Sequence, residues 1–337
     1  MEITMAIVAP FNGLRFNTDV VGDLAAVTAP PYDIISPAQQ KELYEAHPFN
    51  VIRLENGEEF PDDDDNHNKY TRSAEFLEDW MQSEVLRQDF APSLYIYGQK
   101  FTLKDGRTLS YKGIMCLVHL EEFEKKIILP HEETLSKAKT DRLNLMRATG
   151  ANFSPIYSLF NDNSGTVSEI IRKASADEPQ NCFVSADKVT QSLWQISDGE
   201  TIARVKEAFA SKQLFIADGH HRNASAAKVG LKRRAEHPDY TGDEEFNYYL
   251  AVIFPSDQLK IMDYNRVVKD LNGMTSKEFM NKLAEKFDIH EADGRAKPEK
   301  QYDFGMYLDK KWYMLTAKEN LRVNDAVAGL DVSILQD

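Results

Sequence analysis

Cysteine is scarce in this chain: only Cys116 and Cys182 occur among its 337 residues. The two lie far apart and neither belongs to a Cys-x-x-Cys pair, so the sequence indicates neither a disulfide framework nor a zinc ribbon. Long apolar runs are also missing, since none approaches the roughly eighteen residues of a membrane-spanning helix. No charged segment followed by an apolar one opens the chain as in a signal peptide. We therefore expect a cytoplasmic protein without a membrane partner.

Basic residues are in the minority. The chain has 40 Lys and Arg against 54 Asp and Glu, which gives a net charge of −14 and an isoelectric point near 5.1. That charge opposes non-specific binding to nucleic acid, and no patch of basic and aromatic residues suggests a specific site, so we expect no nucleic-acid partner. Walker A, Gly-x-Gly-x-x-Gly and Gly-x-Ser-x-Gly motifs are absent. Four consecutive acids, Asp62–Asp65, precede a predicted helix, and such runs are more often solvated loops than metal sites.

The remaining composition is that of an ordinary globular protein with a large core, at 42% hydrophobic and 28% charged residues. Helical and strand patterns are interspersed, which predicts an α/β (α+β) fold. Asp105-Gly106 predicts a hairpin turn between strands over 93–103 and 108–120. Helices are predicted over residues 37–46, 66–86, 166–174, 200–210 and 276–287, and further strands over 50–54, 153–160, 188–196, 248–255, 259–268, 302–308 and 311–317.

The segment Gln213–Lys228 concentrates unusual residues. Its pattern predicts a short buried strand, a tight turn at Asp218-Gly219 and then a helix. The free N–H groups and the positive dipole end of that helix would suit a phosphate. Gly219 would allow close approach, His220 and His221 could donate or exchange protons, and Arg222 could hold phosphate oxygens in a bidentate fork.

A simpler interpretation of this turn stays open. Asp218 could be only a helix N-cap, Gly219 only a turn residue, and the two His with Arg222 a solvated first turn. A zinc site is disfavoured because the side chains of adjacent His residues diverge on a helix.

A second polar concentration runs from Pro130 to Arg142. Lys137 lies four residues from both Glu133 and Asp141, so these residues could simply pair along one helix face. That explanation accounts less well for His131 and Glu132, which follow the apolar strand at 127–129, where α/β layouts tend to place functional groups.

These motifs carry two resemblances. The sequence Asp-Gly-His-His-Arg after an apolar strand resembles the signature of the ParB/sulfiredoxin superfamily, and with Pro130-His-Glu132 it is most similar to the archaeal-type free serine kinase. Nearly the whole chain resembles the uncharacterised DUF-1015 family, through Pro30–Ser36, Asn50–Glu55, Pro130–Lys137 and Phe153–Pro155.

The resemblance implies a ParB/sulfiredoxin-like nucleotide-binding core over residues 116–256, after an N-terminal α/β domain over 1–115 and before a C-terminal α+β part over 257–337. It implies a phosphotransferase that acts on serine or phosphoserine with ATP or ADP and Mg²⁺, in either direction. The alternative is a nucleotide-binding regulatory module without turnover. Neither the sequence nor the resemblance indicates an oligomeric state.

The resemblance also assigns roles to residues. Glu132 would be the general base, Asp218 would hold the metal or a water, and His220 would take part in catalysis. Phosphate or carboxylate groups would be held by Gly219, His221, Arg222, Lys137, Lys139 and Arg142, and the substrate by His131, Asp33 and Arg53. Family members continue for several dozen residues beyond Leu330–Asp337 with a Pro-Lys-Ser/Thr-Thr element, so we expect this chain to be a truncated or split form. They also often have His near Asn265.

Overall fold

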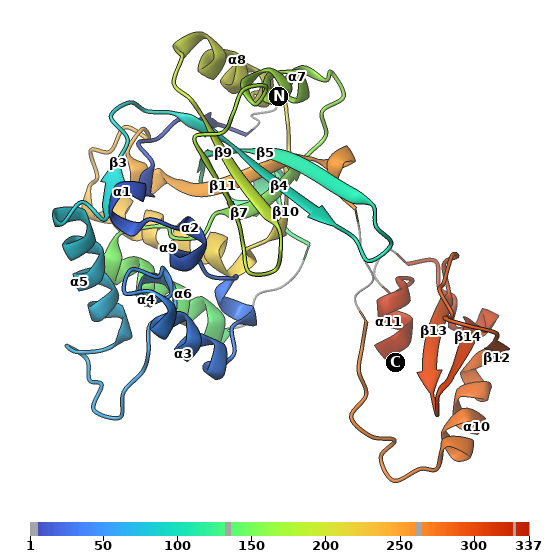
Figure 1. The fold of residues 1–337 in the computed structure, drawn as a ribbon. Coiled ribbons are helices and arrows are strands. Elements are labelled where there is room, and N and C mark those ends of the chain that lie inside the picture. The colour runs from blue at the N-terminus through green and yellow to red at the C-terminus, as the bar shows by residue number, and fades with distance from the viewer. Residues whose placement is uncertain (1–5, 132–135, 261–264, 326–327, 337) are drawn as a thin grey trace. The chain divides into compact units, whose positions relative to one another are not determined.

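The chain forms two compact units, residues 1–260 and 261–337. The computed structural model describes residues 6–131, 136–260, 265–325 and 328–336, without the side chains of residues 136–139 and 336. Figure 1 shows the larger unit as a sheet with helices on its faces and the smaller one as a sheet with helices of its own. The boundary predicted between residues 115 and 116 falls inside one continuous strand, and that predicted after residue 256 lies near the end of the larger unit.

A mixed sheet organises the larger unit and confirms the predicted α/β class. Parallel pairs join β10 to β6 and β11 to β7, and the other pairs are antiparallel. The strand order is β6 (Ile128–Leu129), β10 (Leu214–Asp218), β7 (Ile156–Phe160), β11 (Tyr248–Pro255), β5 (Thr108–His119), β4 (Leu94–Thr102), β9 (Thr190–Ile196) and β8 (Asn181–Val184), with β1 (Val8–Ala9) also paired to β5.

The predicted hairpin is confirmed as β4 and β5. Gly106 takes the positive φ of 84° that its turn needs. Alternation along β5 then divides its side chains between two faces. Ile114, Cys116 and Val118 are buried in the main core, whereas Met115 and Leu117 point to the opposite face.

Helices cover both faces of the sheet. Figure 1 shows α7 (Thr166–Ala174) and α8 (Gly199–Phe209) on one side, with α6 (Ser136–Thr149) and α9 (His220–Glu236) on the other. The apolar stripes of α7 and α8 enter the main core. Both of these helices confirm their predicted spans to within a residue at each end.

The N-terminal helices form a second core around Trp80. The rings of Phe16, Phe49 and Phe76 lie 6.0, 5.8 and 6.1 Å from the Trp80 ring. This part contains α1 (Thr18–Val21), α2 (Leu24–Val27), the 3₁₀ turn η1 (Tyr32–Ile34), α3 (Pro37–Ala46), α4 (Ile52–Glu55), α5 (Lys69–Gln82) and a strand pair, β2 (Leu14–Phe16) with β3 (Leu86–Gln88).

Two strand predictions are wrong. Residues 50–51 lead into α4, which begins at Ile52, because the Asn50 side chain accepts a hydrogen bond from the Ile52 N–H and donates to the carbonyls of Ala26 and Thr28. Of the strand predicted over 259–268, the described residues 259–260 and 265–268 are not extended in a sheet. Both edges of its expected partner β11 are already taken by β5 and β7.

Helix α5 is shorter than predicted. Asn68 caps it in a capping box with Thr71, so the helix begins at Lys69, and it ends at Gln82. Helix α3 confirms its prediction, since the Ser36 hydroxyl accepts from the Gln39 N–H and Pro37 occupies the first turn.

The smaller unit contains a three-stranded antiparallel sheet in the order β12 (Phe287–Ala292), β14 (Lys311–Ala317) and β13 (Asp303–Leu308). It also contains α10 (Ser276–Lys286) and α11 (Asp331–Gln336). The predictions of α10, β13 and β14 are confirmed, while β12 follows directly after α10 and was not predicted. Further 3₁₀ turns of the chain lie at Phe123–Lys125, Glu245–Asn247, Ser256–Gln258 and Glu319–Leu321.

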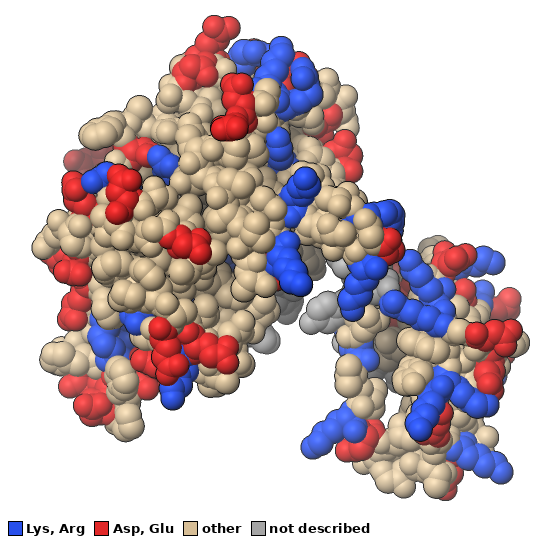
Figure 2. Space-filling view, viewed as in Figure 1, with Lys and Arg blue, Asp and Glu red and all other residues tan. Residues whose placement is uncertain are grey.

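Within the described ranges, the helices are all too short or too polar to span a lipid bilayer. Figure 2 shows acidic and basic side chains interspersed over the visible face of the larger unit.

Candidate functional site

The turn between β10 and α9 has the predicted strand, turn and helix arrangement. Gly219 occupies the N-cap position with φ of 100°, a conformation that residues with a side chain rarely adopt. A Cβ atom at Gly219 would also lie only 3.1 Å from Nε and Nη2 of Arg222. Asp218 is therefore not the N-cap residue, which rules out the simplest structural role considered for it.

Arg222 is held beside this turn. Its Nη1 donates to the Pro155 carbonyl at 2.7 Å, and its Nη2 donates to the Asp218 carboxylate. The Arg222 side chain is 15% exposed, whereas that of Asp218 is 63% exposed. Among the described residues, the buried Nε of Arg222 has no hydrogen-bond acceptor. The guanidinium thus lies at the first turn of α9, and its Nε–H group can still donate a hydrogen bond.

His131 joins the second polar segment to the same turn. Its backbone N–H donates to Nε2 of His220 at 3.2 Å, and its Nδ1 lies 2.7 Å from the Ile216 carbonyl oxygen. The two rings meet edge to face at 4.6 Å. Because Nε2 of His220 accepts a hydrogen bond, that nitrogen carries no proton, and the buried imidazole is neutral. A carbonyl can only accept, so His131 carries a proton on Nδ1.

Arg142 is the second cation of the site and is 5% exposed. Its Nε and Nη2 donate to Asp141 Oδ2 at 2.9 and 2.6 Å, and its guanidinium carbon lies 3.9 Å from the centre of the Tyr32 ring. Asp141 also accepts from Lys69 and Tyr70 of α5, at 2.8 and 2.9 Å. Burial opposes ionisation of Asp141, but Arg142 and Lys69 outweigh it and hold the pKa of this carboxyl below its usual value.

Two N-terminal residues complete the charged cluster. Burial raises the pKa of Tyr32, and the nearby charges of Arg142 and Arg222 partly offset that rise. Glu55, the last residue of α4, keeps some contact with solvent, but dense packing around its carboxylate raises its pKa against the opposing effect of Arg142 and Arg222. No described residue donates a hydrogen bond to the Glu55 carboxylate. Such a carboxylate, close to two cations, is suited to proton exchange.

The structure thus brings many of the predicted residues together. Asp33 is exposed and lies within electrostatic range of Tyr32 and Glu55. His221 lies in the first turn of α9. The predicted residues that meet at this site are His131, Arg142, Asp218, Gly219, His220, His221, Arg222 and Asp33.

Other predicted residues lie elsewhere or cannot be placed. The Arg53 guanidinium donates to the carbonyls of Tyr44 and His47, both at 2.8 Å, and stacks on the Tyr44 ring, so it caps the end of α3. Its role in substrate binding stays a prediction. Glu132 lies outside the described residues, as do the side chains of Lys137 and Lys139. Asn265 is described and belongs to the smaller unit.

Sequence reasoning missed Glu55 and Tyr32 as site residues. Both lie in stretches that carried the family resemblance, Asn50–Glu55 and Pro30–Ser36. The site residues predicted from those stretches were instead Arg53 and Asp33. What identifies them is their proximity to Arg142 and Arg222 in the folded chain. The sequence alone does not reveal that proximity.

A metal would have few protein ligands here. The described part of the chain contains no group of three or more His, Cys, Asp or Glu placed to hold an ion. The Asp218 carboxylate is largely exposed beside the turn. One carboxylate with phosphate oxygens and water is a common way for proteins to hold nucleotide-bound Mg²⁺, so Asp218 fits that mode of binding.

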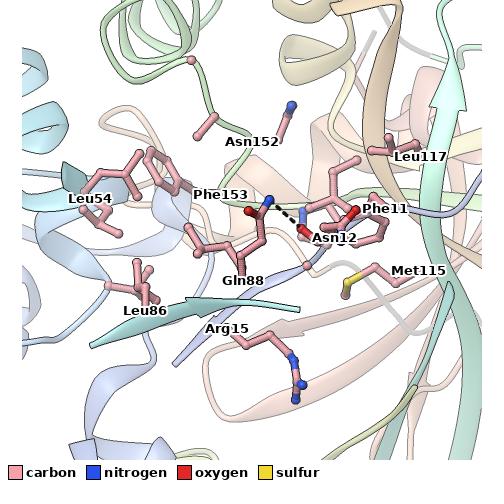
Figure 3. Close-up of a pocket in the computed structure, with 18 of the residues that line it drawn as sticks. Phe11, Asn12, Arg15, Leu54, Leu86, Gln88, Met115, Leu117, Asn152 and Phe153 are labelled. Carbon is pink, nitrogen blue, oxygen red and sulfur yellow. Dashed lines mark hydrogen bonds between the residues drawn. The ribbon is translucent and has the colours of Figure 1, made fainter. Parts of the chain in front are cut away.

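Figure 3 shows a large cavity of the larger unit. Its wall includes Leu54, the neighbour of Glu55, and Pro155, whose carbonyl accepts from Arg222. Its volume is about 1090 Å³, and it lies on the face of β5 to which Met115 and Leu117 point. The segment that follows α6, including Asn152 and Phe153, forms another part of its wall.

Comparison with known proteins identifies the family. A family model described as "Protein of unknown function (DUF1015)" matches residues 8–333. Searches of curated proteins and of solved structures found no match. The chain therefore belongs to the DUF1015 family, as the motifs Pro30–Ser36 and Asn50–Glu55 indicated.

Proposed function

We propose that this protein is a phosphotransferase that acts on serine or phosphoserine with ATP or ADP. The observation that carries the proposal is the convergence of four distant segments on one charged cluster. The turn at Asp218–Arg222 meets His131, Arg142 and the N-terminal pair Tyr32 and Glu55.

The cluster suits an anion with several oxygens. The start of α9 offers N–H groups and the positive end of the helix dipole, and Gly219 allows close approach of a phosphate. Arg222 and Arg142 add two guanidinium groups, whose fork geometry matches phosphate and carboxylate oxygens. Two cations with different surroundings could hold the two anionic groups of phosphoserine, its phosphate and its carboxylate.

The reaction also needs a group that exchanges a proton with serine. When ATP phosphorylates serine, the bond between the γ-phosphorus and the oxygen that stays with ADP breaks. A bond between this phosphorus and the serine hydroxyl oxygen forms, and the hydroxyl proton passes to a base. The family resemblance assigns that role to Glu132, whose neighbour His131 contacts the α9 turn. Among the described carboxylates Glu55 is the next candidate, because its pKa is raised toward the pH of the reaction.

The remaining residues position and neutralise charge. Phosphoryl transfer passes through a loose transition state in which placement and electrostatics supply most of the rate enhancement. Neutral His220 orients the backbone at His131, and Asp141 holds Arg142 in place. Mg²⁺, with Asp218 as its protein carboxylate, would neutralise charge on the nucleotide phosphates.

The test follows both directions of transfer. The full-length protein is incubated with Mg²⁺ and either ³²P-phosphoserine plus ADP or serine plus γ-³²P-ATP, and the products are separated by chromatography. We expect label to pass between the amino acid and the nucleotide, and Arg222→Ala to abolish the transfer. Arg172→Ala is the matched control, because Arg172 lies on α7 and forms an exposed ion pair with Glu169 of the same helix.

Two results would count against the proposal. Nucleotide binding without transfer in either direction would favour the regulatory module, which needs the phosphate turn but no base. Equal transfer by wild type and Arg222→Ala would place the chemistry away from this cluster.

A further inference from the structure

The cavity beside the cluster is larger than the proposed amino-acid substrate requires. At about 1090 Å³ it exceeds the roughly 300–1,000 Å³ typical of sites for drug-sized ligands. Serine or phosphoserine would leave most of this volume filled only with water. A second and larger part of the reacting system has room to bind here.

The cavity and the cluster share chain segments. Four of the segments that place a residue in the cluster also place a nearby residue in the cavity wall. The pairs are Tyr32 with Ala29, Glu55 with Leu54, Arg142 with Met146, and Arg222 with Ala226. Pro155, whose carbonyl binds Arg222, lines the cavity as well. Along α9, Ala226 lies about 6 Å beyond Arg222 at the usual rise of 1.5 Å per residue.

The wall combines flat rings with carboxamides. Phe11, Phe153 and Tyr248 contribute rings, and Figure 3 shows the Gln88 side chain between Phe153 and Phe11. Gln88 makes one long hydrogen bond of 3.5 Å, to the Asn12 carbonyl. The Asn152 side chain forms no hydrogen bond with another described residue. Aromatic faces stack on heterocycles, and carboxamides pair with their donor and acceptor edges.

We propose that this cavity holds the base and ribose of the nucleotide, with its phosphates at the Asp218–Arg222 turn. The inference rests on the proposed function and adds where the nucleoside binds. The carboxamides distinguish this wall from a purely apolar site for a fatty chain, which would leave such groups without partners.

The test compares ADP with pyrophosphate, which has the same phosphate linkage and no nucleoside. Met115 points into the cavity from β5, so Met115→Trp fills part of the space. We expect this variant to weaken ADP binding by roughly 10-fold or more, the scale of lost base stacking, and to leave pyrophosphate binding unchanged in calorimetry. Val184→Trp is the matched control, since Val184 is 57% exposed on β8 and does not line the cavity.

A second measurement uses the unaltered protein and so does not depend on how the variant folds. With methionine methyl groups labelled with ¹³C and Met115 assigned through Met115→Leu, ADP should shift the Met115 methyl resonance and pyrophosphate should not. Met306 of the smaller unit serves as a reference.

The outcomes separate the two proposals. Normal ADP affinity in Met115→Trp, or an unshifted Met115 methyl resonance when ADP is bound, overturns the assignment of the nucleoside to the cavity. The phosphotransferase proposal then still stands if Arg222→Ala weakens the binding of both ADP and pyrophosphate. A wild-type protein that binds neither ADP nor pyrophosphate overturns both.

Discussion

Asp141 is expected to be a structural anchor of the candidate site, and Asp141→Ala tests this. The variant removes the acceptor of two hydrogen bonds from Arg142, one from Tyr70 and the ion pair with Lys69. The Arg142 side chain is only 6% exposed and that of Lys69 only 16%, so water cannot fully replace the lost carboxylate. Lys69 would keep its ion pair with Glu59, but the Arg142 guanidinium would lose its close counter-ion.

The magnitude follows from burial. Removing one partner of a fully buried ion pair costs about 3–5 kcal/mol. The Asp141 side chain is 25% exposed, so we expect a lower free-energy cost of about 2–3 kcal/mol, which is also within the range for a single hydrogen bond to a charged group. In a unit of this size that corresponds to a fall in Tm of roughly 4–12 °C.

The assay is thermal unfolding of the full chain, followed by calorimetry so that transitions of the two units can be separated. Asp105→Ala is the control, because Asp105 pairs with Arg107 on an exposed hairpin turn and its loss should leave Tm unchanged. An unchanged Tm in Asp141→Ala at pH 7 would refute the reasoning.

The dependence on pH gives a second check on Asp141. Its pKa is lowered in the folded state, so its stabilising contribution is fully present above the unfolded pKa and is lost as the pH falls through the folded value. The difference in Tm between wild type and Asp141→Ala should therefore shrink below about pH 4, near the ordinary pKa of Asp. A difference that stays constant down to pH 2 would show that the carboxylate charge is not the cause.

Three further predictions concern the site itself. Glu132→Gln should lower the rate of transfer by about 10²–10⁴-fold and leave ADP affinity intact in calorimetry, whereas joint loss of both would indicate a structural Glu132. Glu55→Gln should raise Tm at pH 8 and not at pH 4. The raised pKa of Glu55 means that its ionised form is unfavourable in the folded protein, and Gln resembles the protonated form. A lower Tm of the variant at pH 8 would contradict this. Gly219→Ala should destabilise the fold by about 1–2 kcal/mol, because this position has a positive φ. It should also weaken pyrophosphate binding, because the added Cβ atom displaces Arg222. An unaltered pyrophosphate affinity would argue against a phosphate at this turn.

Local chemistry explains which parts of the fold were predictable. The hairpin of β4 and β5 and the caps of α3 depend on residues a few positions apart, such as Asp105-Gly106 and Ser36-Pro37, and these were predicted correctly. The strand, turn and helix around Gly219 was predictable for the same reason. Where a side chain bonds to distant backbone, as Asn50 does to Ala26, the local apolar pattern gave a strand in place of α4.

The candidate site could be predicted only in part, because its two halves have different origins. The polar turn and His131 stand out in the sequence as concentrations of ionisable residues on short segments. Tyr32 and Glu55 look ordinary there, and only the packing of the N-terminal helices on α6 brings them to Arg142. The same packing creates the cavity, whose wall takes single residues from many segments.

The exposed ion pair of Arg222 is itself an argument for an anionic ligand. Arg142 has Asp141 as a close counter-ion, and Lys69 pairs with both Asp141 and Glu59, so this end of the cluster holds two cations and two carboxylates. At the other end Arg222 pairs with Asp218, which is exposed and therefore displaced at little electrostatic cost. Burial raises the pKa of the Glu55 carboxyl and so favours its neutral form. A phosphate that takes the place of Asp218 would keep the Arg222 guanidinium paired with a negative charge, which a neutral or cationic ligand could not do.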